Sequence, residues 1–360
     1  MAANLNYLSR RVVLGVLRRL REIHARLAGR RFLCLSLAGE VPDGIFINSD
    51  MTVSCNCQDI DGTGRIGDLR STPFEQVFAG PAAQRLRCEL AAGHLPLDRC
   101  AVCFHLRTAG RHEAMRQLDH YRLPRGLSVE NTVRCNLRCL SCCRPQILAT
   151  RGSGKAMTFA DMEIIGQTLA RLDAQYCGFY NLGEPFFSRT VREELEILRR
   201  YRPEMHILVS TNGLLLDSDP KREAALLVDH ILFSIDGITT PMVRRYQRGG
   251  DFDRAYENLC RLIEFRNRRG LRKPRIDWKY VVFRWNDRPA YIRRAIELAR
   301  QAGADSIQFV FARNPISAIS WRFLCSRFYR SLGVPDGWRT RVVWLNRFEG
   351  DSVLAARRAA

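Results

Sequence analysis

The sequence predicts an α/β protein in which a small cysteine-rich domain precedes a partial barrel of six strand–helix units. The barrel is predicted because short apolar runs alternate with amphipathic helical stretches from Leu127 onwards. The small domain is predicted because residues 31–110 form a short, irregular pattern rich in cysteine and glycine. Six units are too few for a closed eight-fold barrel, so we expect a partial one.

The individual elements follow from this alternation. The predicted barrel strands are Leu127–Thr132, Tyr176–Leu182, His206–Ser210, His230–Ser234, Ile276–Val282 and Ser306–Val310. The predicted helices between them are Phe159–Arg171, Thr190–Tyr201, Lys221–Val228, Phe252–Arg269 and Arg288–Ala302. In the smaller domain we expect two short strands within Ile45–Val53 and a helix over Pro73–Arg87.

The expected organisation has four parts. They are a basic amphipathic helix (1–31), the cysteine-rich domain (32–115), the barrel (120–312) and a C-terminal tail of unassigned role (313–360). The tail has a helix-like pattern near Ser320–Leu332.

The chain is strongly basic, with 57 basic and 37 acidic residues and a formal charge of +20. This charge favours attraction to nucleic acid, an acidic membrane surface or a phosphorylated substrate. The alternative is a general arginine-rich composition that implies no anionic partner. The first helix is amphipathic, so it either docks on the protein or lies on anionic lipid. Its apolar positions are Leu5, Leu8, Val12, Val16, Leu20, Ile23 and Leu27.

Thirteen cysteines are many for a chain of 360 residues. The longest early apolar run, Val12–Leu17, is too short and too closely flanked by arginines for a membrane span or a secretory signal. We therefore expect a cytoplasmic protein, membrane-peripheral if its first helix contacts lipid. Because thiols stay reduced there, clustered cysteines indicate metal binding.

The first cysteine cluster, Cys135-Asn-Leu-Arg-Cys139-Leu-Ser-Cys142, follows the first barrel strand. A [4Fe–4S] cluster normally takes four cysteine ligands, so three leave one iron open to a non-protein ligand. The amino and carboxylate groups of S-adenosylmethionine (SAM) are suited to chelate that iron. Zinc is the alternative metal, but zinc sites favour paired Cys-x-x-Cys units.

This cysteine spacing resembles the motif of the radical SAM superfamily, except that Ser141 stands where an aromatic residue is common. The resemblance extends over Leu127–Ala312 and implies a partial (β/α)6 TIM-like barrel. It also implies reductive cleavage of SAM at the cluster to a 5′-deoxyadenosyl radical, with hydrogen abstraction from a substrate.

Further family-like motifs follow successive strands, where parallel α/β folds gather their chemistry. Gly183-Glu184-Pro185 resembles the GGEP motif, whose backbone and glutamate bind the SAM amino group; Leu182 replaces its first glycine. Ser210-Thr-Asn212-Gly resembles the TNG turn, and Ser234-Ile-Asp236-Gly resembles the SxDG motif that binds ribose or carboxylate.

Two arginines, Arg245 and Arg248, lie in a segment that resembles the family's contact to the SAM carboxylate, and Arg248 is the candidate we favour. Asn286 follows the fifth strand, where a polar cofactor contact is common in the family. Ordinary turns and a solvated basic run are the alternatives for these motifs.

A second cysteine group precedes the barrel. Its pattern resembles a SPASM-type auxiliary cluster domain, although that domain usually follows the barrel. The resemblance implies a second iron–sulfur cluster, or zinc, on Cys55, Cys57, Cys100 and Cys103, with Cys88 as a substitute ligand.

The resemblance implies a peptide or protein substrate, with a sugar, lipid head group or other small molecule as the alternative. It also implies an electron donor such as a ferredoxin or flavodoxin. A zinc-stabilised nucleic-acid-binding protein is the competing class, because of the basic charge, but it would not place motifs at strand ends. Three residues are candidates to face the cavity, without an assigned catalytic role: Cys143, Tyr180 and Lys279.

Overall fold

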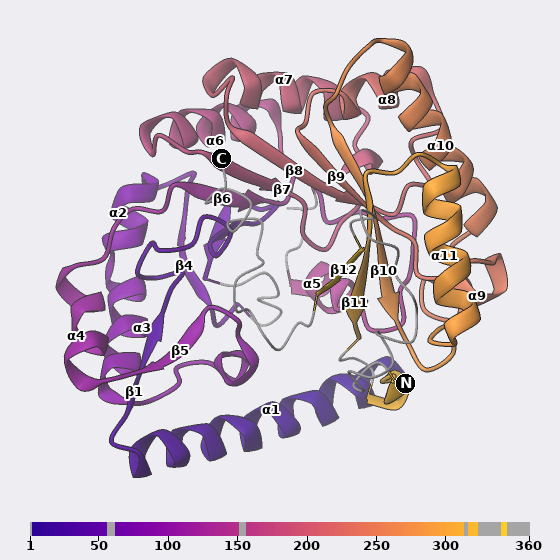
Figure 1. Ribbon diagram of the computed structural model, residues 1–360. Helices are drawn as coiled ribbons and strands as arrows, with labels where there is room; N and C mark the ends of the chain where they lie inside the picture. The colour runs from indigo at the N-terminus through magenta and orange to yellow at the C-terminus, as the bar shows by residue number, and fades with distance from the viewer. Residues whose placement is uncertain (1, 56–61, 151–155, 313–315, 323–339, 344–360) are drawn as a thin grey trace. The chain divides into compact units, whose positions relative to one another are not determined.

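The computed structural model describes residues 2–55, 62–150, 156–312, 316–322 and 340–343 (Figure 1). The chain divides into two compact units. Unit 1 comprises Met1–Val133, Cys143–Gly183 and Glu196–His206, and unit 2 comprises Arg134–Cys142, Glu184–Leu195 and Ile207–Ala360. The domain boundaries expected from the sequence stay predictions.

Unit 1 contains seven of the described strands, in two groups. Strand β1 (Arg31–Cys34) pairs antiparallel with β5 (Leu106–Ala109). In the other group β2 (Phe46–Ile47) lies antiparallel to β3 (Thr52–Ser54) and parallel to β6 (Gly126–Val129). The remaining strands of this group are β4 (Arg65–Asp68), antiparallel to β3, and β7 (Tyr176–Phe179), parallel to β6.

The helices of unit 1 surround these strands. They are α1 (Ala2–Leu27), α2 (Phe74–Ala79), α3 (Pro81–Ala92), η1 (Asp98–Val102), α4 (Arg111–Asp119), α5 (Arg144–Thr150) and α6 (Phe159–Arg171). Helix α6 begins with a capping box, in which Thr158 and Asp161 exchange side-chain-to-backbone hydrogen bonds. Helix α7 (Val191–Tyr201) has residues in both units.

Unit 2 contains a parallel sheet with helices along one side (Figure 1). Its strands, in spatial order, are β8 (His206–Thr211, from its second residue), β9 (His230–Ser234), β10 (Arg275–Val282), β11 (Ser306–Phe311) and β12 (Thr340–Val343). Its helices are η2 (Pro185–Phe187), α8 (Asp219–Ala225), α9 (Thr240–Arg244), α10 (Phe252–Arg268), α11 (Pro289–Gln301) and η3 (Ile316–Ala318).

An aromatic core holds α10 to the sheet of unit 2. Phe252 and Tyr256 of α10 have ring centroids 6.2 and 6.1 Å from that of Trp278 on β10. Trp278 is fully buried, and its indole N–H donates to the carbonyl of Ile235 at 2.8 Å. A buried indole needs such a partner, so this bond fixes the end of β9 against β10.

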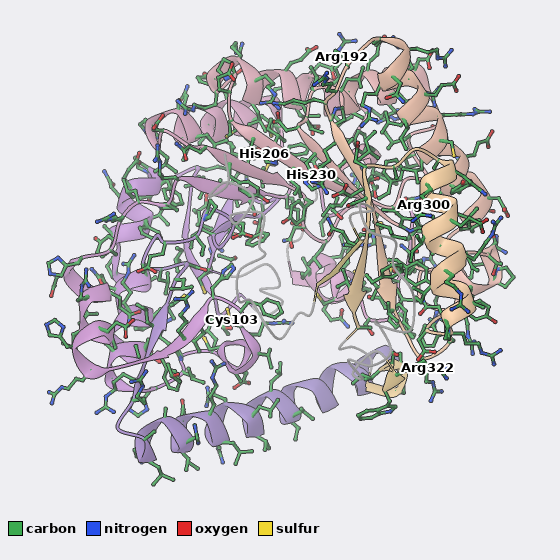
Figure 2. All side chains as sticks on the ribbon, in the orientation of Figure 1. Cys103, Arg192, His206, His230, Arg300 and Arg322 are labelled. Atoms are coloured by element: carbon green, nitrogen blue, oxygen red, sulfur yellow. The ribbon has the colours of Figure 1, made fainter. Side chains whose placement is uncertain are left out.

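On the other side of the same sheet, the acidic group of Asp277 is fully buried and its charge is compensated by two partners, one of them His230, which Figure 2 labels. Its carboxylate accepts from Nε2 of His230 at 2.9 Å and from Nε of Arg275 at 3.0 Å. The buried carboxylate is thus compensated, as a charge in the interior must be.

Most predicted elements agree with the structure, because the alternation of parallel strands and helices is the observed fold. One prediction is wrong: Pro73–Arg87 forms two helices, not one. Gly80 is extended (φ −72°, ψ 169°) and Pro81 opens the second helix. The residue before a proline is disfavoured in helical conformation, so the chain must break there. Of the predicted tail helix, residues 323–332 lie outside the described part.

Helix α1 docks through its polar side. Arg21 donates to the carbonyls of Cys100 and Ala101 at 3.2 and 3.0 Å, and Arg18 pairs with Asp98 at 3.3 Å. The described side chains of its apolar stripe are exposed instead: Val12, Val13, Val16, Leu17, Leu20, Ile23 and Leu27. Among the described residues, no helix is long and apolar enough to cross a membrane.

Candidate active site

The loop that carries Cys135, Cys139 and Cys142 belongs to unit 2 and is held by backbone hydrogen bonds. The amide of Arg138 donates to the carbonyl of Arg248 at 3.0 Å, and that of Leu140 donates to Tyr246 at 2.8 Å. The loop is therefore fastened to the segment between α9 and α10. All three cysteine side chains are partly exposed.

Two N–H donors lie near the sulfur of Cys135. The backbone N–H of Leu137 lies 3.4 Å from Sγ, and the side-chain amide of Asn212 lies 3.9 Å from it. Donors to sulfur favour the thiolate, which is the form that binds metal. Among the described residues, no three Cys, His, Asp or Glu side chains are gathered closely enough to hold an ion. The fit to a cluster thus rests on the chemistry of these donors.

Glu184 fixes the turn that follows β8. Its carboxylate accepts from the Thr211 hydroxyl at 2.7 Å and from the backbone N–H of Asn212 at 2.8 Å, and it is 2 % exposed. Burial raises the pKa of Glu184 to about 7, although these hydrogen bonds oppose the shift. The role that the structure displays for Glu184 is therefore to position the turn.

The turn itself requires glycine at position 213. Gly213 has φ +75°, a left-handed conformation, and a Cβ there would lie 2.7 Å from the ring of Phe233. The neighbouring Asn212 accepts from the amide of Leu214 at 3.0 Å and donates to the side-chain oxygen of Asn136 at 2.9 Å. Asn212 therefore joins the turn after β8 to the cysteine loop.

Gln247 clamps the end of β9. Its amide donates to the carbonyl of Ser234 at 2.8 Å, while its side-chain oxygen accepts from the amide of Asp236 at 3.1 Å. Only 5 % of Gln247 is exposed. The sequence did not single out this residue, because the resemblance in this segment rests on the arginines around it. Its position in the same family-like segment was the available indication.

Asp236 is held in place from two further sides. Its carboxylate accepts from the amide of Val281 at 2.9 Å, and its carbonyl accepts from the side chain of Asn286 at 3.0 Å. Burial raises the pKa of Asp236 to about 6. Asn286 is fully buried and also donates to the carbonyl of Val281, so here it supports the turn.

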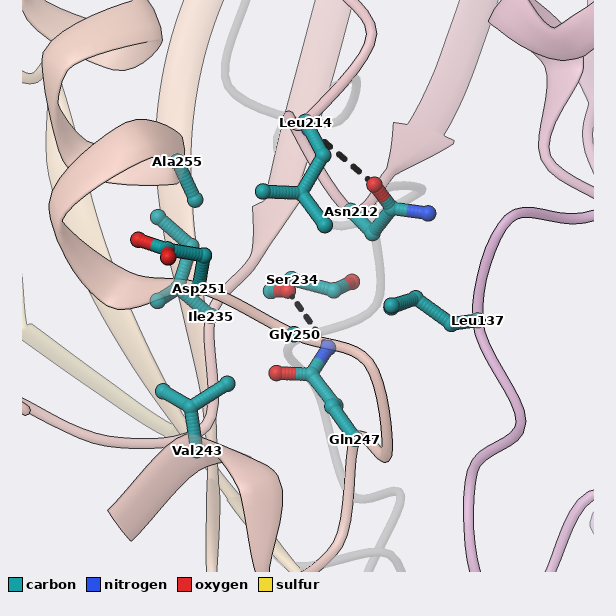
Figure 3. Close-up of a pocket in the computed structure, with 10 residues that line it drawn as sticks. All are labelled: Leu137, Asn212, Leu214, Ser234, Ile235, Val243, Gln247, Gly250, Asp251 and Ala255. Atoms are coloured by element: carbon teal, nitrogen blue, oxygen red, sulfur yellow. Dashed lines mark hydrogen bonds between the residues drawn. The ribbon is translucent and has the colours of Figure 1, made fainter. Parts of the chain in front are cut away.

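A small pocket opens beside these residues (Figure 3). Predicted contact residues Asn212 and Ser234 face it, together with Gln247. Ser234 is also within 3.3 Å of the Ser210 hydroxyl. The full lining is Leu137, Asn212, Leu214, Ser234, Ile235, Val243, Gln247, Gly250, Asp251 and Ala255. Polar groups from the ends of β8 and β9 and from the segment after α9 thus meet apolar walls in one place, as is usual for small-molecule sites.

The structure does not bring all predicted residues to this pocket. The side chain of Arg248 is exposed, and Pro185 is buried at the start of η2. Gly183 is partly exposed and belongs to unit 1. The contacts of these three residues with a cofactor stay predictions.

In the cysteine-rich part of unit 1, Cys100 lies on η1 and Cys103, which Figure 2 labels, follows it directly. The sequence left Cys34 unassigned. It is the last residue of β1, pairs with Leu106 on β5, and interacts electrostatically with Cys103. Burial raises the pKa of Cys34 and of Cys100 to about 12. Cys55 follows β3, and Cys57 lies outside the described residues.

A family sequence model matches part of the chain. The sequence model of the Radical SAM superfamily matches residues 129–269. This range begins before the cysteine loop and ends after α10, so it includes Cys135, Cys139 and Cys142 and the strand ends at Asn212 and Asp236. It does not include the cysteine-rich part before β6.

Curated relatives share the same part of the chain. The GTP 3′,8-cyclase of Petrotoga mobilis is 27% identical over 141 residues, which is 38% of this chain and 42% of the relative. The GTP 3′,8-cyclase of Peptoclostridium acidaminophilum is 24% identical over 133 residues, or 37% of this chain and 41% of the relative. The chain thus matches about two fifths of the length of these relatives.

Among solved structures, Streptococcus suis SuiB bound to S-adenosylmethionine is similar with a TM-score of 0.48. The sequence identity is 13%, and the match covers 88% of this chain and 72% of that chain.

Proposed function

We propose that residues 129–269, which the Radical SAM superfamily model matches, form a radical SAM domain, and that the protein reductively cleaves SAM and abstracts hydrogen from a substrate. The observation that supports this most is the arrangement around Cys135. The cysteine loop, the turn after β8 and the segment after α9 are joined by hydrogen bonds beside one pocket.

Cys135, Cys139 and Cys142 would hold a [4Fe–4S] cluster, which when bound supplies the electron for cleavage of the sulfonium C–S bond. The donors from Leu137 and Asn212 favour the thiolate of Cys135. An external electron donor, such as a ferredoxin or flavodoxin, would be required.

The chain's own residues bind and orient SAM in this proposal. Ser234 and Asn212 face the pocket, and Ser210 lies beside Ser234. Asp236 has one carboxylate oxygen committed to the amide of Val281, which leaves the other for a ribose hydroxyl or an amino group. Gly183, Glu184 and Pro185 would supply backbone contacts to the SAM amino group, and Arg248 would pair with its carboxylate.

A second cluster in the cysteine-rich part would use Cys55, Cys57, Cys100 and Cys103. The proximity of Cys100 and Cys103 along the chain at η1 supports this, and the hydrogen bond from Arg21 of α1 to the carbonyl of Cys100 would stabilise the site. We propose a SPASM-like auxiliary iron–sulfur site, with zinc as the alternative metal.

The substrate we propose is a peptide or protein, and a sugar or lipid head group is the alternative. The exposed apolar stripe of α1 supports a location at an anionic membrane surface. Arg19 and Arg26 are exposed next to that stripe, which suits a lipid interface. The protein would then be cytoplasmic and membrane-peripheral.

The deciding experiment uses protein reconstituted with iron and sulfide, reduced without oxygen and incubated with SAM. The wild type should form 5′-deoxyadenosine, and Cys139→Ala should not. Cys143→Ala is the matched control: this neighbouring cysteine is 5 % exposed and packs with Val133 and Ile147, so the variant should keep the activity. Equal activity of Cys139→Ala and wild type, or zinc in place of iron in the wild type, would exclude the proposal.

A further inference from the structure

Among the described residues, the sheet of unit 2 has a partly exposed face opposite the side that packs on α10. Side chains that alternate with the buried ones along the strands are partly exposed, whereas Trp278 and Tyr280 pack on the helix side. The partly exposed side chains, which define the open face, are Ser210, Leu232, Ser234, Lys279, Val281, Gln308 and Val310.

Lys279 occupies the middle of this open face. In the sheet register it lies opposite Ser234 on β9 and opposite Gln308 on β11. Ser234 faces the pocket, and Gln308 donates to the carboxylate of Asp277 at 3.0 Å. Lys279 therefore brings a positive charge into a row whose other members are neutral.

Among the described residues, the ammonium group of Lys279 lacks the partners that Lys221 and Lys273 have. Lys221 donates to the carbonyl of Phe186 at 2.9 Å, and Lys273 pairs with Asp229 at 2.7 Å. Within the described residues, Nζ of Lys279 takes part in no hydrogen bond or ion pair. A partly buried ammonium without a partner is unfavourable, because it has lost part of its hydration without a compensating contact.

Two charged groups of unit 2 interact with Lys279. Burial lowers the pKa of Lys279, whereas the charges of Asp236 and Cys139 raise it. Asp236 already has an oxygen bound to the amide of Val281. The side chain therefore interacts electrostatically with the turn after β9 and with the cysteine loop, and among the described residues no hydrogen bond joins it to Asp236.

We propose that Lys279 anchors an anionic group of the substrate, a carboxylate or a phosphate, on the open face next to the cysteine loop. An oxyanion would give the ammonium the charged hydrogen bonds that it lacks here. That the anion belongs to a substrate rests on the proposed radical SAM function. The anion site itself does not depend on catalysis.

The test measures anion binding directly. Pyrophosphate and glutarate, as phosphate and carboxylate probes, are titrated by calorimetry into reconstituted, SAM-loaded protein at constant ionic strength. Wild type should bind at least one of them, and Lys279→Met should bind it at least about tenfold more weakly, as expected for loss of a charged hydrogen bond. Lys279→Arg, which keeps the charge, should retain most of the affinity. The preferred probe identifies the anion.

Lys273→Met is the matched control, because it removes the same charge from an exposed site whose partner is Asp229. It should bind the probe as the wild type does. The proposal is overturned if the wild type binds neither probe, if both methionine variants lose affinity equally, or if Lys279→Met weakens SAM binding as much as probe binding. The last result would assign the lysine to SAM. Failure of the wild type to form 5′-deoxyadenosine would instead refute the proposed function and leave the anion result standing.

Discussion

The side-chain amide nitrogen of Asn212 lies 3.9 Å from the sulfur of Cys135, within the range of a weak donor to sulfur. The same amide donates to Asn136 at 2.9 Å. A turn after one strand therefore contacts the first candidate cluster ligand. Hydrogen bonds to ligand sulfurs stabilise the reduced, more negative cluster, so Asn212 connects the pocket with the redox properties of the loop.

Replacement of Asn212 by leucine should make the reconstituted cluster harder to reduce. The free energy of unfolding of the variant should also be about 1–3 kcal/mol lower, because the amide of Leu214 loses its acceptor. The measurement is a redox titration followed by electron paramagnetic resonance. Asn258→Leu is the control, since Asn258 is also buried and donates to the same turn at Gly213, but no bond to sulfur is lost. An equal shift in both variants would contradict the specific role of Asn212.

Gln247→Leu should weaken SAM binding by about 5- to 150-fold, because both the carbonyl of Ser234 and the amide of Asp236 lose their partner. Equilibrium dialysis with labelled SAM measures this. Gln117→Leu provides the comparison: Gln117 is buried and bonds the backbone in the same way, to Phe32 and Ala114 in unit 1. If the two variants bind SAM alike, Gln247 does not position the site.

The order of strands and helices could be predicted from the sequence because both periodicities are local. The turns at Asn212 and Asp236 were found for the same reason, as glycine follows each of them. Gln247 was missed because its role depends on a loop that folds back onto β9, which no local pattern reveals. Glu184 was expected to contact SAM, but its burial against β8 depends on packing between distant segments.

The orientation of α1 also lay beyond the sequence pattern. Periodicity showed that the helix has an apolar side but not which side would dock. Docking is decided by Arg18, Arg21 and Glu22, whose partners lie more than seventy residues away. Cys34 was similarly left out of the second cysteine group, because the pairing of β1 with β5 brings it near Cys103 only in the folded chain.

Glu184 should make stability depend on pH. Its pKa of about 7 in the folded protein exceeds the ordinary 4.5, so burial favours the protonated form. Stability from this group is complete below pH 4.5 and is lost as pH rises through about 7, by on the order of 3 kcal/mol. Denaturant unfolding of wild type and Glu184→Gln from pH 5 to 8 measures it. The difference between the two proteins should change in favour of the variant as pH rises; a constant difference would disprove the shift.

The second cysteine group should account for half of the iron. If it holds a [4Fe–4S] cluster, the double variant Cys100→Ala, Cys103→Ala should bind about four fewer iron atoms per chain than wild type. Cys260→Ala on α10 is the control and should keep the full content. Metal analysis of anaerobic protein decides: zinc lost in place of iron would identify a zinc site, and no loss of either metal would remove the auxiliary site from the account.

The exposed stripe of α1 should bind anionic lipid. Leu20 and Ile23 are 57% and 52% exposed, so Leu20→Gln, Ile23→Gln should leave folding intact. Wild type should sediment with vesicles that contain phosphatidylglycerol and much less with phosphatidylcholine alone. Each substitution should weaken binding by roughly tenfold, because an apolar side chain no longer enters the interface.

Leu271→Gln is the matched control for this stripe, because Leu271 is similarly exposed at 43% but follows α10. It should sediment like the wild type. High salt should reduce binding of the wild type, since the arginines beside the stripe, Arg19 and Arg26, contribute through screened charges. If the double glutamine variant instead changes from dimer to monomer in sedimentation velocity, and lipid binding is absent throughout, the stripe is covered by a second copy of the chain. That outcome would replace the lipid surface by a protein interface.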